Sequence, residues 1–206
     1  RRSSLEVSRS VMIGHGFTMA FIRIAITSLL LVISGAASSQ EDPDPVLREL
    51  LREAASEADS FEDHFAAQVW LTDMSARLER QVAEPKERLE ILRRVHYEAM
   101  RTELPPELVL AVIDVESNFD RFAISHAGAR GLMQIMPFWL NEIGRPDDNL
   151  MHIDTNLRFG CTILKYYLDL ENGDLPLALG RYNGSRGKRT YPNKVLDKLR
   201  LKWFRV

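Results

Sequence analysis

Apolar residues recur every three or four positions along much of this chain, the spacing of α-helices that bury one face. The first such stripe covers residues 46–58, and Asp44 and Pro45 supply a cap and a first turn for it. Two more stripes cover residues 61–82 and 85–101. We expect three amphipathic helices whose shared apolar face includes Leu47, Leu51, Phe65, Trp70 and Leu78.

A fourth pattern, over residues 108–115, is apolar almost all the way round. Such a helix is buried on every side. Pro105 and Pro106 end the preceding helix and begin this one, because proline is tolerated in the first helical turn. The core helix therefore ends at Glu116, and Asn118 is a suitable terminator.

The rest of the chain continues in the same way. Helical patterns cover residues 132–143, 155–171, 175–182 and 193–203, and no segment alternates with the period of a strand. The loop at 120–130 has room for a small ribbon at most. We predict a mainly α protein.

Composition and charge add little to this picture. A chain of 206 residues that is 45% hydrophobic suits one globular domain with appendages. The net charge is −2, but residues 181–206 carry nine lysines and arginines against one acid, Asp197. This basic end is either an ordinary solvated surface or a face for an anionic polymer such as the cell wall. It lacks the aromatic interleaving of a nucleic-acid site, so no nucleic-acid partner is expected.

Residues 1–39 have the pattern of upstream sequence and a secretory signal. Arg23 precedes an apolar run at 24–33, and small residues follow, with cleavage expected near Ala37 or Ser39. The run is about ten residues long, whereas a membrane span needs about twenty. We expect no stable membrane span after cleavage; an uncleaved signal that acts as an anchor is the alternative.

Metal, disulfide and cofactor chemistry find no support in the sequence. Cys161 is the single cysteine, so no disulfide or cysteine-based metal site is available. His126 and His152 have no partners at metal-ligand spacing. We expect neither a metal nor a cofactor.

Three blocks carry the chemistry. They are Glu116-Ser117, then Gly131-Leu132-Met133-Gln134-Ile135-Met136-Pro137, and then Tyr182-Asn183-Gly184. In their order and gaps, over residues 104–196, they resemble the soluble lytic transglycosylase family, enzymes of the lysozyme superfamily that cleave peptidoglycan. The resemblance implies a lysozyme-like catalytic domain at 102–206, preceded by a helical extension at 40–101.

The resemblance also assigns roles to single residues. It implies that Glu116 is the one general acid and base, and that the product ends in 1,6-anhydro-N-acetylmuramic acid. It implies glycan contacts for the remaining site residues, of which Tyr191 is the weakest candidate: Ser125, Met133, Gln134, Tyr182, Asn183 and Tyr191. The third block departs from the family's usual Ala-Tyr-Asn-Ala-Gly, because Arg181 replaces the first alanine and the residues after Asn183 differ.

The acid assignment also has a physical basis. A carboxyl at the end of a buried apolar helix has a raised pKa, which keeps it protonated for a leaving oxygen. Most glycosidases use a second carboxylate, but Asp114 lies on a different side of the helix from Glu116. Asp120 is nearer to a suitable place, yet it fits a turn cap equally well.

Other interpretations remain open from the sequence. A hydrolase like the goose-type lysozymes would need a second acid, with Asp120 as the candidate, and a non-catalytic cell-wall glycan-binding protein would keep only the groove. The expected compartment is the bacterial periplasm. The helical extension could dock an envelope-assembly partner. The sequence does not indicate whether cleavage is endo or exo, which stem peptides are preferred, or what the oligomeric state is.

Overall fold

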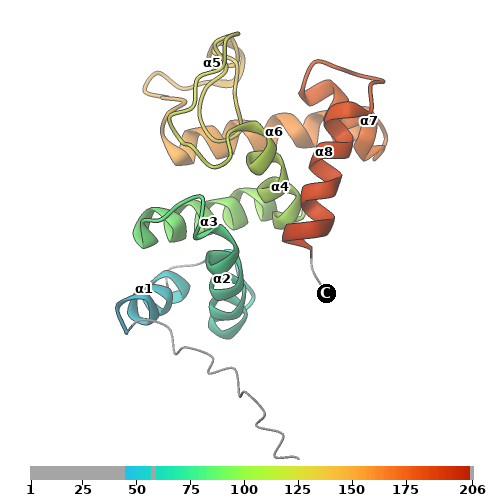
Figure 1. Ribbon diagram of the computed structural model, residues 1–206. Helices are drawn as coiled ribbons and strands as arrows, with labels where there is room; N and C mark the ends of the chain where they lie inside the picture. Colours follow the sequence, from blue (N-terminus) through green and yellow to red (C-terminus); the bar gives the residue numbers. More distant parts are fainter. Residues whose placement is uncertain (1–44, 57–58, 205–206) are drawn as a thin grey trace, which may run out of the picture. The chain divides into compact units, whose positions relative to one another are not determined.

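The protein is seen here as a computed structural model that describes residues 45–56 and 59–204 (Figure 1). All described residues belong to one compact unit, residues 42–206. The expected signal sequence at 1–39 therefore lies outside the described part. Within the described part no helix is both long and apolar enough to cross a membrane.

The described residues are mainly helical, as predicted, and their only β-structure is two isolated bridges. Most of the expected helices are present, although several boundaries shift by a few residues. The helices are α1 (Pro45–Ser56), α2 (His64–Leu78), α3 (Pro85–Arg101), α4 (Pro106–Glu116), α5 (Trp139–Ile143), α6 (Ile153–Leu170), α7 (Leu175–Tyr182), α8 (Thr190–Lys198) and a closing π-helical turn, η1 (Leu199–Trp203).

Carboxylate side chains cap the N-termini of three of these helices. Asp63 accepts a hydrogen bond from the Ala66 amide at 2.7 Å before α2, and Asp174 accepts one from the Leu177 amide at 2.9 Å before α7. Glu84 does the same for α3, whose first residue is a proline. These side chains satisfy amides that lack a partner inside the helix, which fixes where each helix begins.

The predicted helix at 132–143 is wrong in its first half. Only α5 is helical there, whereas residues 132–138 form a turn in which Arg130 pairs with Ile135 through an isolated antiparallel bridge. Gly131 and Gln134 have positive φ angles of 73° and 50°, which a right-handed helix cannot contain. Pro137 also lacks the amide that a helix would need.

Helix α4 lies at the centre of the fold, between α3 on one side and α8 on the other (Figure 1). Its residues 108–114 are all buried, and Val109 to Ile113 are 0% exposed. The prediction of a core helix is therefore confirmed. A helix packed on all sides holds its last residue, Glu116, at a fixed place.

The extension helices share this core. In α2 the buried stripe is Ala67, Leu71, Met74 and Leu78, so Phe65 lies off it and is 76% exposed, contrary to the expected apolar face. Helix α3 packs on α1 and α2 and also on α4 and α6. The first three helices and the rest of the described chain thus have one continuous hydrophobic core.

Candidate active site

Glu116 is the last residue of α4, and the chain turns sharply behind it. Asn118 and Phe119 have positive φ angles of 52° and 68°, which ends the helix at the predicted place. The Ser117 hydroxyl donates to the carbonyl of Leu132 at 2.7 Å, so the first block is tied directly to the second. The Glu116 side chain is left half-buried at the junction.

The environment of Glu116 suits a proton donor. Burial raises the pKa of its carboxyl, and a hydrogen bond from the Tyr191 hydroxyl to Oε1, at 2.5 Å, opposes part of that increase. Burial, followed by the charge of Glu116, also raises the pKa of Tyr191 well above its usual value. Tyr191 therefore stays a neutral phenol that donates to Glu116.

Tyr191 was the weakest candidate in the sequence, yet it makes the closest described contact with Glu116. It lies in the first turn of α8, is 8% exposed, and is separated from Glu116 by 75 positions. No local pattern links these two residues. The one signal available was the family resemblance over residues 104–196, which includes Tyr191 although none of the three blocks does.

The two neighbouring aspartates are engaged elsewhere. Asp114 is 0% exposed at its side chain; burial acts to raise its pKa, but Lys198 at 2.6 Å and Lys202 at 3.0 Å lower it overall. Asp120 accepts a hydrogen bond from the Phe122 amide at 2.9 Å and so stabilises a turn. Among the described residues, neither aspartate is hydrogen-bonded to Glu116 or to Tyr191.

One buried amide side chain hydrogen-bonds the backbone in and around the second block. Asn156, in α6, is 1% exposed; it accepts from the Met133 amide at 2.7 Å and donates to the carbonyls of Arg130 and Leu150, both at 2.8 Å. A Cβ on Gly131 would lie 2.3 Å from the Asn156 side-chain nitrogen, so only glycine fits there. This arrangement agrees with a structural role for Asn156.

Met133 lies in the core rather than in a groove. Its side chain is 0% exposed and packs on Gly160, where a Cβ would approach the sulfur to 2.1 Å. The backbone carbonyl of Met133 accepts a hydrogen bond from the Tyr182 hydroxyl at 2.8 Å. Because the thioether never reaches the surface, we do not retain Met133 among the glycan-contacting side chains.

Gln134 and Ser125 use polar groups to shape the loop. The Gln134 side-chain nitrogen donates to the carbonyls of Gly131 at 2.9 Å and Ala123 at 3.2 Å. The Ser125 hydroxyl accepts from the Ala129 amide at 3.0 Å. Both side chains are half-buried, so any contact with a sugar would come in addition to these bonds.

A cleft of 270 Å³ lies beside this loop, between the second and third blocks and α6. Tyr182 and Asn183 line it, as does Gln134, so the structure brings three of the predicted residues together. Sequence reasoning missed three further aromatic walls; for two of them the signal was the bulky pair directly after Pro137. These walls are Phe138, Trp139 and Tyr167.

Tyr182 lines the cleft, and its phenol interacts electrostatically with Glu116. Burial raises its pKa well above the usual value, and the charge of Glu116 adds to the effect. Glu116 is not among the residues that line this cleft, and neither are Ser125 and Tyr191.

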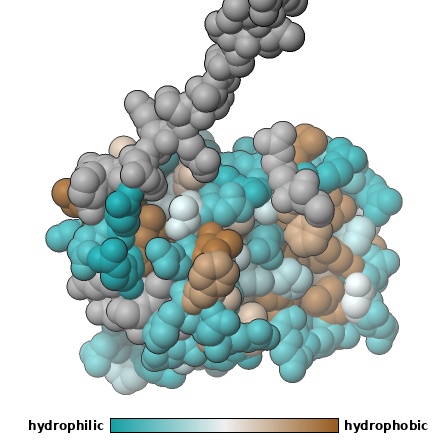
Figure 2. All heavy atoms as spheres, turned by 90° about the horizontal axis from the view of Figure 1, so that it is seen from below, coloured by the Kyte–Doolittle hydropathy of each residue, from teal (hydrophilic) through white to brown (hydrophobic). Residues whose placement is uncertain are grey.

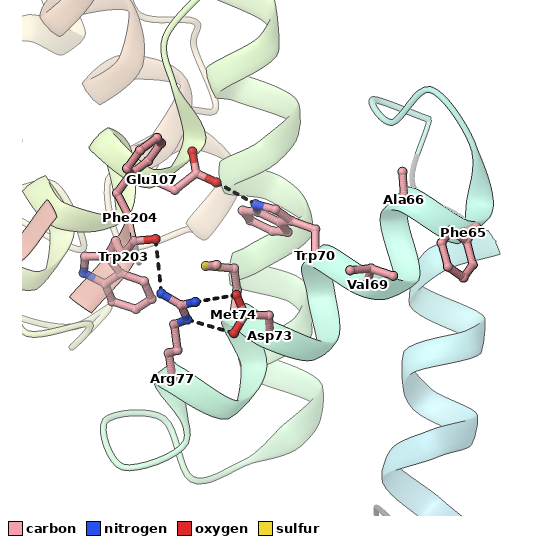
Figure 3. Close-up of a pocket in the computed structure, with 10 residues that line it drawn as sticks. All are labelled: Phe65, Ala66, Val69, Trp70, Asp73, Met74, Arg77, Glu107, Trp203 and Phe204. Atoms are coloured by element: carbon pink, nitrogen blue, oxygen red, sulfur yellow. Dashed lines mark hydrogen bonds and ion pairs between the residues drawn. The ribbon is translucent and has the colours of Figure 1, made fainter. Parts of the chain in front are cut away.

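A larger cavity, of 520 Å³, lies on α2, the start of α4 and the C-terminal segment (Figure 3). Trp70 donates to Glu107 across it at 2.9 Å, and Arg77 donates to the carbonyl of Lys202 at 2.6 Å. Figure 2 shows one face of the molecule, on which hydrophobic side chains lie in groups among hydrophilic ones. This cavity contains none of the predicted site residues.

The part of the chain that the structure describes holds no group of three or more histidine, cysteine or carboxylate side chains arranged for a metal ion. Cys161 is buried, and burial raises the pKa of its thiol. Such a thiol is inert as a nucleophile or a ligand.

Comparison with known proteins supports the family resemblance of the three blocks. The family described as "Transglycosylase SLT domain" matches residues 94–199. A protein named "Transglycosylase" from Enterobacteria phage PRD1 is 32% identical over 105 residues, which are 48% of this chain and 38% of the phage protein.

A solved structure of an inactive mutant of lytic transglycosylase Slt from Pseudomonas aeruginosa is also similar. The identity is 22%, the TM-score is 0.41, and the match covers 74% of this chain and 31% of that one. The chain thus spans less than half the length of either relative.

Proposed function

This chain belongs to the transglycosylase SLT domain family, and from that premise we propose that it is a peptidoglycan lytic transglycosylase. In this proposal it breaks the β-1,4 bond between N-acetylmuramic acid and N-acetylglucosamine without water. The observation that carries the proposal is Glu116, a half-buried carboxyl with a raised pKa that accepts a hydrogen bond from a neutral Tyr191.

In the first step, protonated Glu116 gives its proton to the glycosidic oxygen, and the C1–O bond of N-acetylmuramic acid breaks. The acetamido group of that sugar stabilises the positive charge at C1. The raised pKa of Glu116 supports this step, because a protonated carboxyl is available closer to neutral pH than usual.

In the second step, ionised Glu116 takes the proton from the C6 hydroxyl of the same sugar, whose oxygen bonds to C1. A 1,6-anhydro ring forms, and Glu116 is protonated again. Tyr191 stabilises the ionised state between the two steps through its hydrogen bond. The nucleophile is already tethered near C1, so a second carboxylate that activates water is not needed.

The cleft supplies groups that suit an acetamido sugar. Aromatic walls pack against sugar faces, and the amide of Asn183 can bond hydroxyl or acetamido groups. We assign Tyr182, Asn183 and Gln134 to glycan binding in this cleft, and Ser125 to positioning a sugar near Glu116. The partner is thus the glycan strand.

Peptidoglycan lies outside the cytoplasm, so this function places the protein in an extracytoplasmic compartment. We propose the periplasm, reached through the signal pattern in residues 1–39. The helical extension at 40–101 offers a surface for an envelope-assembly partner, including the exposed Phe65.

The products released from purified sacculi test the proposed reaction. We expect muropeptides that end in 1,6-anhydro-N-acetylmuramic acid, lighter by one water than hydrolytic products and inert to borohydride. Borohydride-reducible ends as the main product would instead indicate a hydrolase, with Asp120 as the first residue to substitute. Binding to sacculi without any release would indicate a non-catalytic glycan-binding protein.

A further inference from the structure

The cleft beside the second block has one charged wall. Its described lining is aromatic, aliphatic and amide in character, apart from the guanidinium of Arg181. Arg181 lies in the last turn of α7, directly before Tyr182.

A buried carboxylate fixes this guanidinium. Glu171, just after α6, is 5% exposed at its side chain and accepts a hydrogen bond from Nε of Arg181. Arg186 approaches the same carboxylate with two nitrogens, at 2.6 and 3.0 Å. Hydrogen bonds from Arg186 and Arg181 lower the pKa of Glu171 to about 2, so it stays ionised wherever the protein is folded near neutral pH.

Glu171 is shared between two guanidiniums. The other nearby acid, Asp174, caps α7 through the Leu177 amide at 2.9 Å and also acts electrostatically on Arg186. Lys188 and Arg189 follow on the same exposed loop and add positive charge.

The bond from Arg181 to Glu171 uses Nε, and the Arg181 side chain is 34% exposed. Its two terminal nitrogens are therefore the ones that can meet a ligand, and their planar geometry matches a carboxylate. Because Glu171 already holds the side chain, little rotamer entropy is lost when a carboxylate binds.

We propose that Arg181 binds a carboxylate carried by the glycan strand and makes this cleft selective for acidic over neutral acetamido sugars. The inference rests on the function proposed above. Two groups of the substrate have this chemistry: the lactyl carboxylate of a peptide-free N-acetylmuramic acid, and the free carboxylates of a stem peptide.

The test compares kcat/KM of the full chain on three substrates. These are peptide-free strands with free lactyl groups, strands with stem peptides, and neutral chitin oligosaccharides. For Arg181→Gln we expect the ratio of acidic to neutral kcat/KM to fall roughly tenfold, as for the loss of a charge-assisted hydrogen bond. Arg181→Lys, which keeps the charge, should recover part of the ratio.

Arg186→Gln is the matched control. It also removes one partner of Glu171, but Arg186 does not line the cleft. The ratio should stay at the wild-type value in this variant. Added salt should lower the wild-type ratio, because charge recognition at a partly exposed site is screened.

The substrates separate the sources of the carboxylate. A fall confined to peptide-free strands identifies the lactyl group, and a fall confined to peptide-bearing strands identifies the stem peptide; either result supports the proposal. An unchanged ratio in Arg181→Gln, or an equal fall in Arg186→Gln, overturns it.

Failure of the reaction itself would be distinguishable. If the wild-type protein cleaves none of the three substrates, the proposed function is wrong. Calorimetric titration of the same three glycans then tests whether Arg181 binds a carboxylate. Tighter binding of the acidic strands, lost in Arg181→Gln, would uphold carboxylate recognition. Equal binding of acidic and neutral glycans would reject it.

Discussion

At the scale of single residues, Glu116 combines a chemical role with a cost in stability. Glu116→Gln keeps the shape of the side chain and an oxygen for Tyr191, but it cannot deliver a proton. General acid–base catalysis contributes about 10²- to 10⁴-fold, so we expect turnover of sacculi to fall by at least that factor. Circular dichroism should show an unchanged helix content; near-normal turnover by the folded variant would exclude Glu116 as the acid.

The same substitution should change how stability depends on pH. Burial raises the pKa of Glu116 in the folded protein, so its contribution to stability is present at low pH and is lost as pH rises through the folded pKa. The glutamine variant has no such loss. We therefore expect Glu116→Gln to melt at a higher temperature than wild type at pH 7, with a smaller difference at pH 4.

We expect Tyr191 to affect the pH dependence of kcat/KM rather than the binding of the glycan. Its hydrogen bond lowers the pKa of Glu116, so Tyr191→Phe should raise that pKa further. The alkaline limb of the kcat/KM profile should then move to higher pH. Tyr166→Phe, which changes an exposed tyrosine on α6, is the control and should leave the profile unchanged. A shift to lower pH in Tyr191→Phe would contradict the assigned hydrogen bond.

At the scale of the elements, a buried histidine joins the turn before α2 to α3. His96 is 8% exposed, stacks on Phe61 at 3.5 Å between ring centroids, and forms a 2.8 Å hydrogen bond with the Ser60 hydroxyl. Burial lowers its pKa to about 4. The edge of Trp70, at 5.1 Å, closes the cluster.

This depressed pKa predicts acid sensitivity. The stability that neutral His96 contributes is present above pH 6.5 and is lost as pH falls toward 4, by about 3 kcal/mol at most. His96→Gln should lose less of its free energy of unfolding between pH 7 and 4 than wild type, as measured by urea denaturation. His126→Gln, at an exposed turn, is the control. Equal losses in wild type and His96→Gln would show that His96 is not the responsible group.

Asp114 joins α4 to the C-terminal helices. It accepts from Lys198 on α8, and from Lys202 and the Trp203 indole at 3.1 Å on η1. Asp114→Asn should destabilise the protein by about 1.5–3 kcal/mol, the usual range for a hydrogen bond to a charged group. Asp197→Asn, which breaks an exposed pair with Arg200, should cost at most about 1 kcal/mol. Similar values for the two variants would show that burial does not strengthen the Asp114 cluster.

At the scale of the whole molecule, we expect the helical extension to contribute to stability, because it shares the hydrophobic core. Leu71 and Leu78 on α2, and Leu92 on α3, are 0% exposed in the shared core. A chain that starts near Arg101 loses all of these contacts, together with Arg77, which holds the carbonyls of the C-terminal segment. We expect such a chain to unfold at a much lower temperature than the full protein.

A chain that starts at residue 59 is the matched control, because it removes α1 and keeps α2 and α3. It should retain most of the thermal stability and the cleavage activity. If the shorter chain from Arg101 were soluble and equally stable, the apolar face of the extension would have to belong to a different partner.

The sequence by itself determined the helical class, the core helix α4 and the place of Glu116. These follow from local rules, because the period of apolar residues reports which face of a helix is buried, and proline and asparagine mark its ends. It also excluded Asp114 as a partner of Glu116, since two positions along a helix point to different sides.

The tertiary structure alone decided the rest. Tyr191 meets Glu116 because α8 packs on α4, and no local spacing reports a contact across 75 positions. Residues 132–138 leave the predicted helix because Asn156 accepts from the Met133 amide and the Gln134 side chain donates to the carbonyl of Gly131, which together hold a turn. Apolar spacing cannot reveal this, since a buried turn and a buried helix hide the same kind of residue. The charge of Arg181 is visible in the sequence, but its place in the cleft depends on how three distant segments pack together.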